Sequence, residues 1–333
     1  MDVSPASLAP PAPARSPARR GLARGTWVRL ALGVLGLAAT ALVVAGVGAE
    51  LVWRTLEPAL PWVPVLCLLE LGRIACETVA AHRAFGARAR DIPLRTLFRA
   101  NLVGLSLGAL APAPRVVNET IKATMLAPHV GVPVATSAGL AMQAATLVSV
   151  GLFSIPCGVA ILALGGASVW FWAALLHAVV LVGSGLALRL AMRARGPARS
   201  VARRFPRLAP GIAELSGHAR LGSAWLVGPT LALVASRLFQ VGQLAIGACA
   251  LGASAGFAEA FAAEGVNLVA LAVGVLVPGG FGATDGAFTL AAELLGTDAA
   301  RATSLALLLR SMQLVWLLVA SLVLFVDARR RSA

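Results

Sequence analysis

Apolar runs long enough to cross a lipid bilayer follow one another through most of this sequence. A transmembrane helix needs about 20 consecutive, mainly apolar residues. Six runs meet that requirement: residues 28–48, 60–81, 133–163, 168–190, 222–250 and 301–326. Hydrophobic residues make up 59% of the chain and charged residues 13%, with a mean hydropathy of +0.85. Because a soluble domain cannot bury so much apolar surface, the composition excludes a soluble enzyme and predicts an all-α, polytopic transmembrane bundle with about six full spans.

The net charge of +14 is distributed between the apolar runs rather than over one surface. Most of the basic residues are arginines that lie in four clusters: residues 1–29, 83–99, 189–220 and 329–331. When the spans are counted along the chain, all four clusters fall on the same side of the membrane. This is the positive-inside pattern, which indicates cytoplasmic N- and C-termini in a cell (inner) membrane. The sequence contains no nucleic-acid-binding motif, so we expect no nucleic-acid partner.

The domain organisation follows from these runs. Residues 1–27 are rich in Ala, Pro and Arg without periodicity and predict a disordered cytoplasmic tail. Residues 28–326 predict one transmembrane domain, with a cytoplasmic Arg-rich loop at 191–221, and residues 327–333 a basic cytoplasmic tail. The run 28–48 resembles a signal peptide in its flanks, but its length favours a retained first span.

Two further pairs of apolar runs are interrupted by helix breakers and predict broken or re-entrant hairpins. Runs 97–111 and 116–127 are too short to span singly, and so is the second member of the pair 257–277 and 283–296. Proline removes a backbone donor and glycine disfavours helix, so each hairpin should break where these residues gather. The predicted break residues are Pro112 and Pro114 in the first hairpin, and Pro278, Gly279, Gly280 and Gly282 in the second.

The order of spans and hairpins indicates an internal repeat. Residues 60–163 and 222–326 each comprise a span, a hairpin and a span, and they begin on opposite sides of the membrane. An acidic residue follows the first proline of each break by seven residues, Glu119 after Pro112 and Asp285 after Pro278. Inverted-topology repeats in transporters place a substrate site at their broken helices. We therefore expect an inverted-topology repeat here, with accidental similarity between apolar sequences as the alternative.

Seven basic residues lie outside the clusters, and five of them lie at membrane depth or at the hairpin breaks. An ionisable side chain in the bilayer core costs about 2.5–3.5 kcal/mol on insertion scales, so each needs a partner or a wet cavity. Four of them are candidates for binding a lipid phosphate, because guanidinium and ammonium groups bind phosphate at helix N-termini and in clefts: Arg115, Lys122, Arg237 and Arg310. Candidate charge partners or cavity-lining residues are Glu70, Arg73, Glu77, Glu119, Asp285, Glu293, Gln240 and Gln313.

Each of these groups has a structural interpretation beside the functional one. Glu70, Arg73 and Glu77 are spaced to share a helix face, either as a self-neutralising seam between helices or as the wall of a polar cavity. Asp285 and Glu293 are candidate counter-ions for Arg237 and Arg310, or substrate or proton ligands. The spacing of the residues leaves these alternatives open.

No catalytic, cofactor or metal motif is present in the sequence. The four cysteines lie inside apolar runs without CxxC spacing, and His177 on an apolar face is typical of a core histidine. We therefore expect no cofactor, no metal site and no enzymatic activity from this chain.

The residues around the two breaks resemble the lysylphosphatidylglycerol synthase transmembrane-region family, also called flippase-like membrane proteins. Residues 276–288, with Asp285, followed by Leu295-Gly296 and Leu309-Arg310, are similar to the family's P-x-G-x-G-x-x-E stretch, glycine loop and Arg-bearing last span. Residues 101–122 are similar to its N-x-x-x-P-G-R-x-G-E-x-x-R/K pattern, with Ala113, Val116 or Asn118 where the family has glycine. The resemblance covers about residues 28–326.

The resemblance implies a multi-pass membrane protein that moves an amino-acylated phospholipid between leaflets, with the aminoacyl transfer done by a separate soluble domain that this chain lacks. We expect a flippase-like protein that translocates or binds an anionic, amino-acylated or polyprenyl-type lipid. Two alternatives remain: a non-catalytic membrane partner of an enzyme in envelope-lipid or polysaccharide biosynthesis, and an intramembrane lipid-modifying enzyme.

Overall fold

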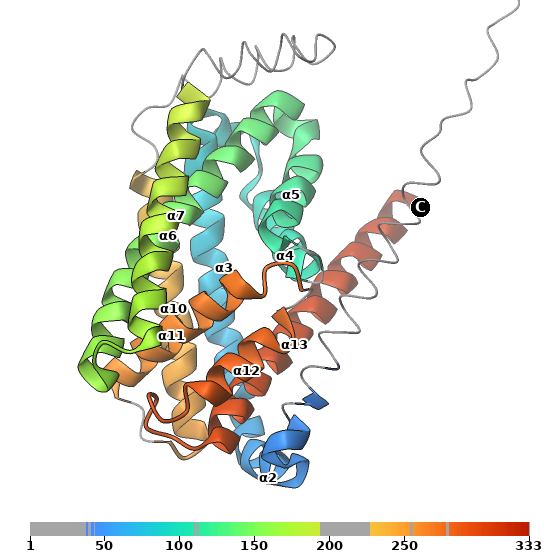
Figure 1. The fold of residues 1–333 in the computed structure, drawn as a ribbon. Helices are drawn as coiled ribbons and strands as arrows, with labels where there is room; N and C mark the ends of the chain where they lie inside the picture. The colour runs from blue at the N-terminus through green and yellow to red at the C-terminus, as the bar shows by residue number, and fades with distance from the viewer. Residues whose placement is uncertain are drawn as a thin grey trace, which may run out of the picture.

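The computed structural model describes residues 44–109, 111, 113–193, 227–253, 256–277 and 280–332, together with residues 38, 41 and 42. Within this part of the chain the regular elements are all helical, as predicted (Figure 1). In chain order they are α2 (Ala49–Leu56), η1 (Glu57–Trp62), α3 (Val63–Phe85), η2 (Gly86–Asp91), α4 (Leu94–Ala109), α5 (Pro114–Val130), α6 (Val132–Gly165), α7 (Val169–Arg193), α10 (Val227–Ala250), α11 (Phe257–Val273), α12 (Ala283–Leu290) and α13 (Ala299–Ser332).

Five segments of the described chain are long and apolar enough to cross a membrane. They are Ala49–Asp91, Val132–Gly165, Val169–Met192, Val227–Ala250 and Ala299–Val326. They correspond to five of the six predicted spans, and the polytopic helical bundle is confirmed. The remaining predicted span, 28–48, lies largely outside the described residues, as do the tail 1–27 and most of the Arg-rich loop. At the C-terminus, α13 continues through the predicted basic tail as far as Ser332.

Both predicted hairpins consist of two helices separated by a break. In the first, α4 has 16 residues and α5 has 17, which is about 25 Å of helix each and less than the hydrocarbon thickness. In the second, α11 has 17 residues and α12 only 8. The predicted run 283–296 is therefore helical only to Leu290, after which the chain turns towards α13. Of the predicted break residues, Pro112, Pro278 and Gly279 lie outside the described part of the chain.

Helix α3 lies in the middle of the bundle and packs closely against α10 (Figure 1). Gly72 permits this approach, because a Cβ atom there would lie 2.5 Å from the ring of Phe239. Small residues allow membrane helices to pack at short distance, where van der Waals contact replaces the missing hydrophobic force. The side chain of Gln243 bonds to the carbonyl of Leu66, near the start of α3, while Gly228 lies against Arg83 near its end. The two helices therefore run antiparallel.

The two halves of the chain contain the same order of elements. Helices α3, α4, α5 and α6 form a long helix, two shorter helices around a break, and a long helix, and α10 to α13 repeat that order. The antiparallel arrangement of α3 and α10, the first helices of the two halves, is what an inverted repeat requires. The repeat itself stays a prediction.

Candidate functional site

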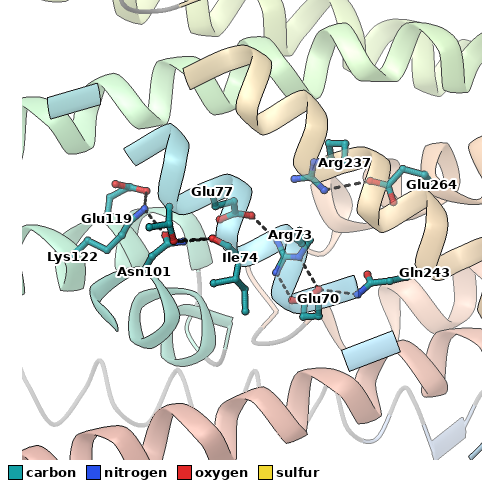
Figure 2. Close-up of polar contacts among 11 residues, drawn as sticks. Glu70, Arg73, Ile74, Glu77, Asn101, Glu119, Lys122, Arg237, Gln243 and Glu264 are labelled. Atoms are coloured by element: carbon teal, nitrogen blue, oxygen red, sulfur yellow. Dashed lines mark hydrogen bonds and ion pairs between the residues drawn. The ribbon is translucent and has the colours of Figure 1, made fainter. Parts of the chain in front are cut away.

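Eight charged side chains from four helices gather around the contact between α3 and α10. We call them the central charged cluster, and Figure 2 labels all of its members except Arg115. Its members are Glu70, Arg73 and Glu77 on α3, Arg115, Glu119 and Lys122 on α5, Arg237 on α10, and Glu264 on α11. The cluster contains four cations and four carboxylates, so its formal charges balance.

The α3 members form the local network that their spacing predicts. Arg73 Nη2 lies 2.5 Å from Glu70 Oε1, and its Nε donates to Glu70 Oε2 at 2.8 Å. Its Nη1 donates to Glu77 Oε1 at 2.6 Å. Both carboxylates are buried and accept from the same guanidinium. Arg73 therefore has its charge neutralised by residues of its own helix.

A glutamine that the sequence analysis did not select completes this network. Gln243 on α10 is fully buried, and its Nε2 donates to Glu70 Oε2 at 3.0 Å and to the Leu66 carbonyl at 3.2 Å. Its Oε1 has no hydrogen-bond partner among the described residues. The predicted glutamine, Gln240, is only partly buried. Both lie on one apolar helix, and only the rotation of α10 against α3 decides which of them faces Glu70.

Lys122 is held by its own helix and by α4. Its Nζ lies 2.5 Å from Glu119 Oε1 and 3.4 Å from Oδ1 of Asn101. Asn101 is fully buried, and its amide donates to Thr78 Oγ1 and to the Ile74 carbonyl of α3, each at 3.2 Å. Glu119 and Lys122 also line a small cleft between α3, α5 and α6. The ammonium group of Lys122 is thus engaged in the contact between three helices.

Arg237 has a partner that the sequence analysis did not identify. Its Nη1 lies 3.3 Å from Oε1 of Glu264 on α11, and no second ion pair links Arg237 to the described residues. Oε2 of Glu264 accepts from Asn267 Nδ2 at 3.0 Å. The expectation that Asp285 or Glu293 is the counter-ion of Arg237 is wrong. Glu264 lies 27 residues after Arg237, so no helical spacing could reveal the pair.

Arg115 is the exception among the eight. It is the second residue of α5, directly after the break, and it is partly buried. Its guanidinium makes no hydrogen bond and no ion pair with the residues that the structure describes, but its charge interacts electrostatically with Arg237, Glu77, Arg73 and Glu119. The guanidinium groups of Arg115 on α5 and Arg237 on α10 therefore lie near one another, and that of Arg115 contacts no carboxylate among the described residues. This arrangement favours a bound anion, as does the N-terminus of α5.

Arg310 belongs to a separate site at the second hairpin, which we call the Arg310 clamp. From α13 it bonds to both oxygens of Asp285, with Nε to Oδ1 at 2.8 Å and Nη2 to Oδ2 at 3.0 Å. Nη2 also donates to Thr284 Oγ1 at 2.6 Å and to the Gly280 carbonyl at 3.0 Å. The guanidinium carbon lies 4.2 Å from the ring centre of Phe281. Of the two arginines for which Asp285 was a candidate counter-ion, the structure selects Arg310.

The remaining predicted residues lie outside both sites. Glu293 and Gln313 are exposed, and Gln240 makes no hydrogen bond with the described residues. Within the described part of the chain, no group of three or more His, Cys, Asp or Glu side chains is arranged to hold a metal ion.

The two hairpins touch where they break. The backbone N–H of Ala113 donates to the carbonyl of Val275 at 3.1 Å, which links the start of α5 to the segment after α11. Ala113 has φ 53° and ψ 61°, a left-handed conformation that costs an L-residue about 1–2 kcal/mol. The strained residue directly precedes Pro114 and Arg115, so the break of the first hairpin leads directly into the central charged cluster.

Membrane-spanning helices, buried ion pairs and two touching hairpins define the class of this protein, a multi-pass integral membrane protein with a polar centre. The model of the lysylphosphatidylglycerol synthase TM region family matches residues 26–321, nearly the whole chain, and the chain belongs to that family. This confirms the resemblance drawn from the two break motifs. The comparisons with curated proteins and with solved structures found no match.

Proposed function

We propose that this protein is a flippase-like transporter that moves a lipid with an anionic headgroup between the leaflets of the cell (inner) membrane. The observation that carries the proposal is Arg115, a partly buried guanidinium that makes no ion pair with the described residues and lies near Arg237. Phosphate and carboxylate groups bind guanidinium through two parallel hydrogen bonds, which suits a site between two arginines.

The four predicted phosphate ligands differ in how much of their charge is available. Lys122 is neutralised by Glu119 at 2.5 Å, and Arg310 is surrounded by acceptors in its clamp. Arg237 makes a single 3.3 Å contact with a carboxylate. We therefore assign the anionic group to Arg115 and Arg237, and give Lys122 and Arg310 the role of holding the hairpins in place.

Leaflet transfer in reconstituted vesicles tests the proposal. The full chain is placed in phosphatidylcholine vesicles that contain a trace of tail-labelled phosphatidylglycerol, and a membrane-impermeant quencher reports how much label reaches the outer leaflet. We expect transfer by the wild type and its loss in Arg115→Met. Arg301→Met is the matched control, because Arg301 is exposed and pairs with Asp298 away from both sites. Normal transfer by Arg115→Met would overturn the site assignment.

The alternative, a non-catalytic partner in envelope-lipid or polysaccharide biosynthesis, is favoured by one observation. Seven of the eight charged residues in the central charged cluster take part in ion pairs within the protein, as in a seam that only packs helices. Absence of transfer by the pure protein, together with its co-purification with a lipid-modifying enzyme, would favour this role. Our proposal includes no enzymatic activity and no cofactor for the chain itself, and it places both termini in the cytoplasm, where the basic clusters belong.

A further inference from the structure

Glu264 is a carboxylate that depends on a single cation. It is fully buried on α11, with 0% of its surface exposed. One oxygen lies 3.3 Å from Arg237 Nη1, and the other accepts from the Asn267 amide at 3.0 Å. The proposed function gives the same Arg237 to the anionic group of the lipid. Lipid and Glu264 therefore compete for one guanidinium.

The charged and titratable groups around Glu264 do not offer a replacement for Arg237. On α3, Arg73 interacts with Glu264 electrostatically but bonds to Glu70 and Glu77. Cys157 on α6 and His177 on α7 are the titratable groups that face this pair from those helices. On α12, Asp285 is held by Arg310. When Arg237 turns to a lipid anion, Glu264 keeps only the neutral amide of Asn267 as a hydrogen-bonding partner among the described residues.

An isolated carboxylate in such a place is unstable as an anion. Burying an unpaired charge costs many kcal/mol in a medium of low dielectric constant, and in practice the group takes up a proton instead. Removing one partner of a buried ion pair has the same consequence for the group that remains. A protonated Glu264 keeps its carbonyl oxygen as an acceptor for Asn267, so the neutral form fits the same surroundings.

We infer that anion binding at Arg237 is coupled to the uptake of one proton by Glu264, so that a negatively charged lipid crosses together with a proton. The carboxylate takes this proton from the aqueous phase when the lipid arrives. It returns the proton to water when the lipid leaves and the contact with Arg237 forms again. The coupling rests on the proposed function, and it adds to it the chemical identity of a co-transported ion.

A comparison with Asp285 in the Arg310 clamp shows why we assign proton uptake to Glu264 and not to every buried carboxylate. Asp285 is also fully buried, but it is held by two bonds from Arg310 and by the backbone N–H of Gly282. A lipid anion at Arg115 and Arg237 removes none of these partners. Only the carboxylate that shares its cation with the substrate changes its surroundings when the substrate binds.

Binding and proton uptake are measured together to test the coupling. Phosphatidylglycerol is added to the full chain in a neutral detergent with little buffer, a pH indicator reports the protons taken up, and tail-labelled lipid reports binding. A phosphodiester stays singly ionised near neutral pH, so the lipid itself takes up no proton. We expect about one proton per lipid bound to the wild type, and an affinity that rises as pH falls, since linkage is reciprocal.

Two variants assign the proton to its residue. Glu264→Gln keeps a hydrogen-bonding side chain but cannot titrate, so it should bind lipid with no proton uptake and no dependence on pH. Glu259→Gln on the same helix is the matched control and should behave as the wild type, because Glu259 lies at the start of α11 away from Arg237. In vesicles with a pH gradient, the gradient should drive accumulation of the lipid in one leaflet for the wild type and not for Glu264→Gln.

The outcomes separate the inference from the function on which it rests. Lipid binding and transfer by the wild type without proton uptake overturn the coupling and leave the proposed function standing. Proton uptake that persists in Glu264→Gln also overturns it, because another group then titrates. Failure of the wild type to bind phosphatidylglycerol or to transfer it overturns both. The wild-type proton count does not depend on how well the variant folds.

Discussion

Each of the two hairpins consists of two helices around a break, but the arginines at the two breaks make different contacts. In the first, Arg115 stands directly after the break and makes no ion pair with the described residues. In the second, Arg310 reaches the break from α13 and bonds to Asp285, Thr284 and the Gly280 carbonyl. An arginine whose donors are occupied fixes a backbone, whereas one without a carboxylate in contact is available to a ligand. The comparison therefore supports the proposal that the first hairpin binds the lipid anion and the second serves as an anchor.

The backbones at the two breaks differ as well. The second hairpin places glycine at its left-handed positions, Gly280 with φ 63° and Gly282 with φ 77°. The first hairpin places Ala113 at such a position, with φ 53°. Strained residues of this kind persist only where the surrounding structure holds them, and they gather at functional sites. The strained residue and Arg115, which makes no ion pair with the described residues, thus fall on the same hairpin.

The largest expected effect is on the stability of the second hairpin. Arg310→Met leaves the fully buried Asp285 without its cation, and breaking a buried pair in this way costs about 3–5 kcal/mol. Thermal unfolding in detergent measures the loss. The same change in the first hairpin, Arg115→Met, should leave stability almost unaltered. Equal losses in both variants would remove the distinction between the two hairpins.

A second prediction concerns lipid affinity. Arg115→Met removes charge-assisted hydrogen bonds to the headgroup that are worth about 1.5–3 kcal/mol, or about 10- to 100-fold in affinity. Titration of the detergent-solubilised protein with tail-labelled phosphatidylglycerol measures this change. Arg115→Lys should recover part of the affinity, because the charge returns without the planar fork. An unchanged affinity in Arg115→Met contradicts the assignment.

Helix packing should be equally tight in the two hairpins. A Cβ atom at Gly108 would lie 2.9 Å from the Pro114 carbonyl, and one at Gly274 would lie 2.8 Å from Ala283 Cβ. Gly108→Ala and Gly274→Ala should each cost about 1–3 kcal/mol, the usual effect of overpacking. Gly183→Ala on α7 is the control, since nothing lies within 4 Å of its added methyl group. A large loss in only one hairpin would show that packing, too, divides them.

The smallest expected effect is the change in protein stability when backbone strain at a break is removed or introduced. Ala113→Gly should stabilise the protein by about 1 kcal/mol, because glycine adopts the left-handed conformation without a Cβ clash. The reverse change in the second hairpin, Gly280→Ala, should destabilise the protein by a similar amount, because Gly280 has φ 63°. The loss should not be larger, since the added methyl group would meet only ordinary contacts at 3.4 and 3.7 Å. Melting temperatures of the two variants check the signs. Destabilisation by Ala113→Gly would contradict the strain at the first break.

Much of this molecule was accessible from the sequence, because the deciding interactions act over short stretches of chain. Five spans and both hairpins follow from the length of the apolar runs and from prolines and glycines that cannot continue a helix. The network of Glu70, Arg73 and Glu77 follows from the 3.6-residue period of a single helix, as does the pair of Glu119 and Lys122.

Only the tertiary structure decided which charges meet between helices. Glu264 and Gln243 were not predicted from the sequence as site residues, although each is fully buried beside a residue that was. Glu293 and Gln313 were predicted, but both are exposed. The tertiary structure also pairs Asp285 with Arg310 and not with Arg237. It leaves Arg115 without an ion pair to the described residues. Helical spacing specifies which side chains share a face, but the partner across a contact depends on how each helix is rotated and shifted against its neighbour. That rotation is set by close approaches such as Gly72 against Phe239, which no stretch of sequence contains by itself.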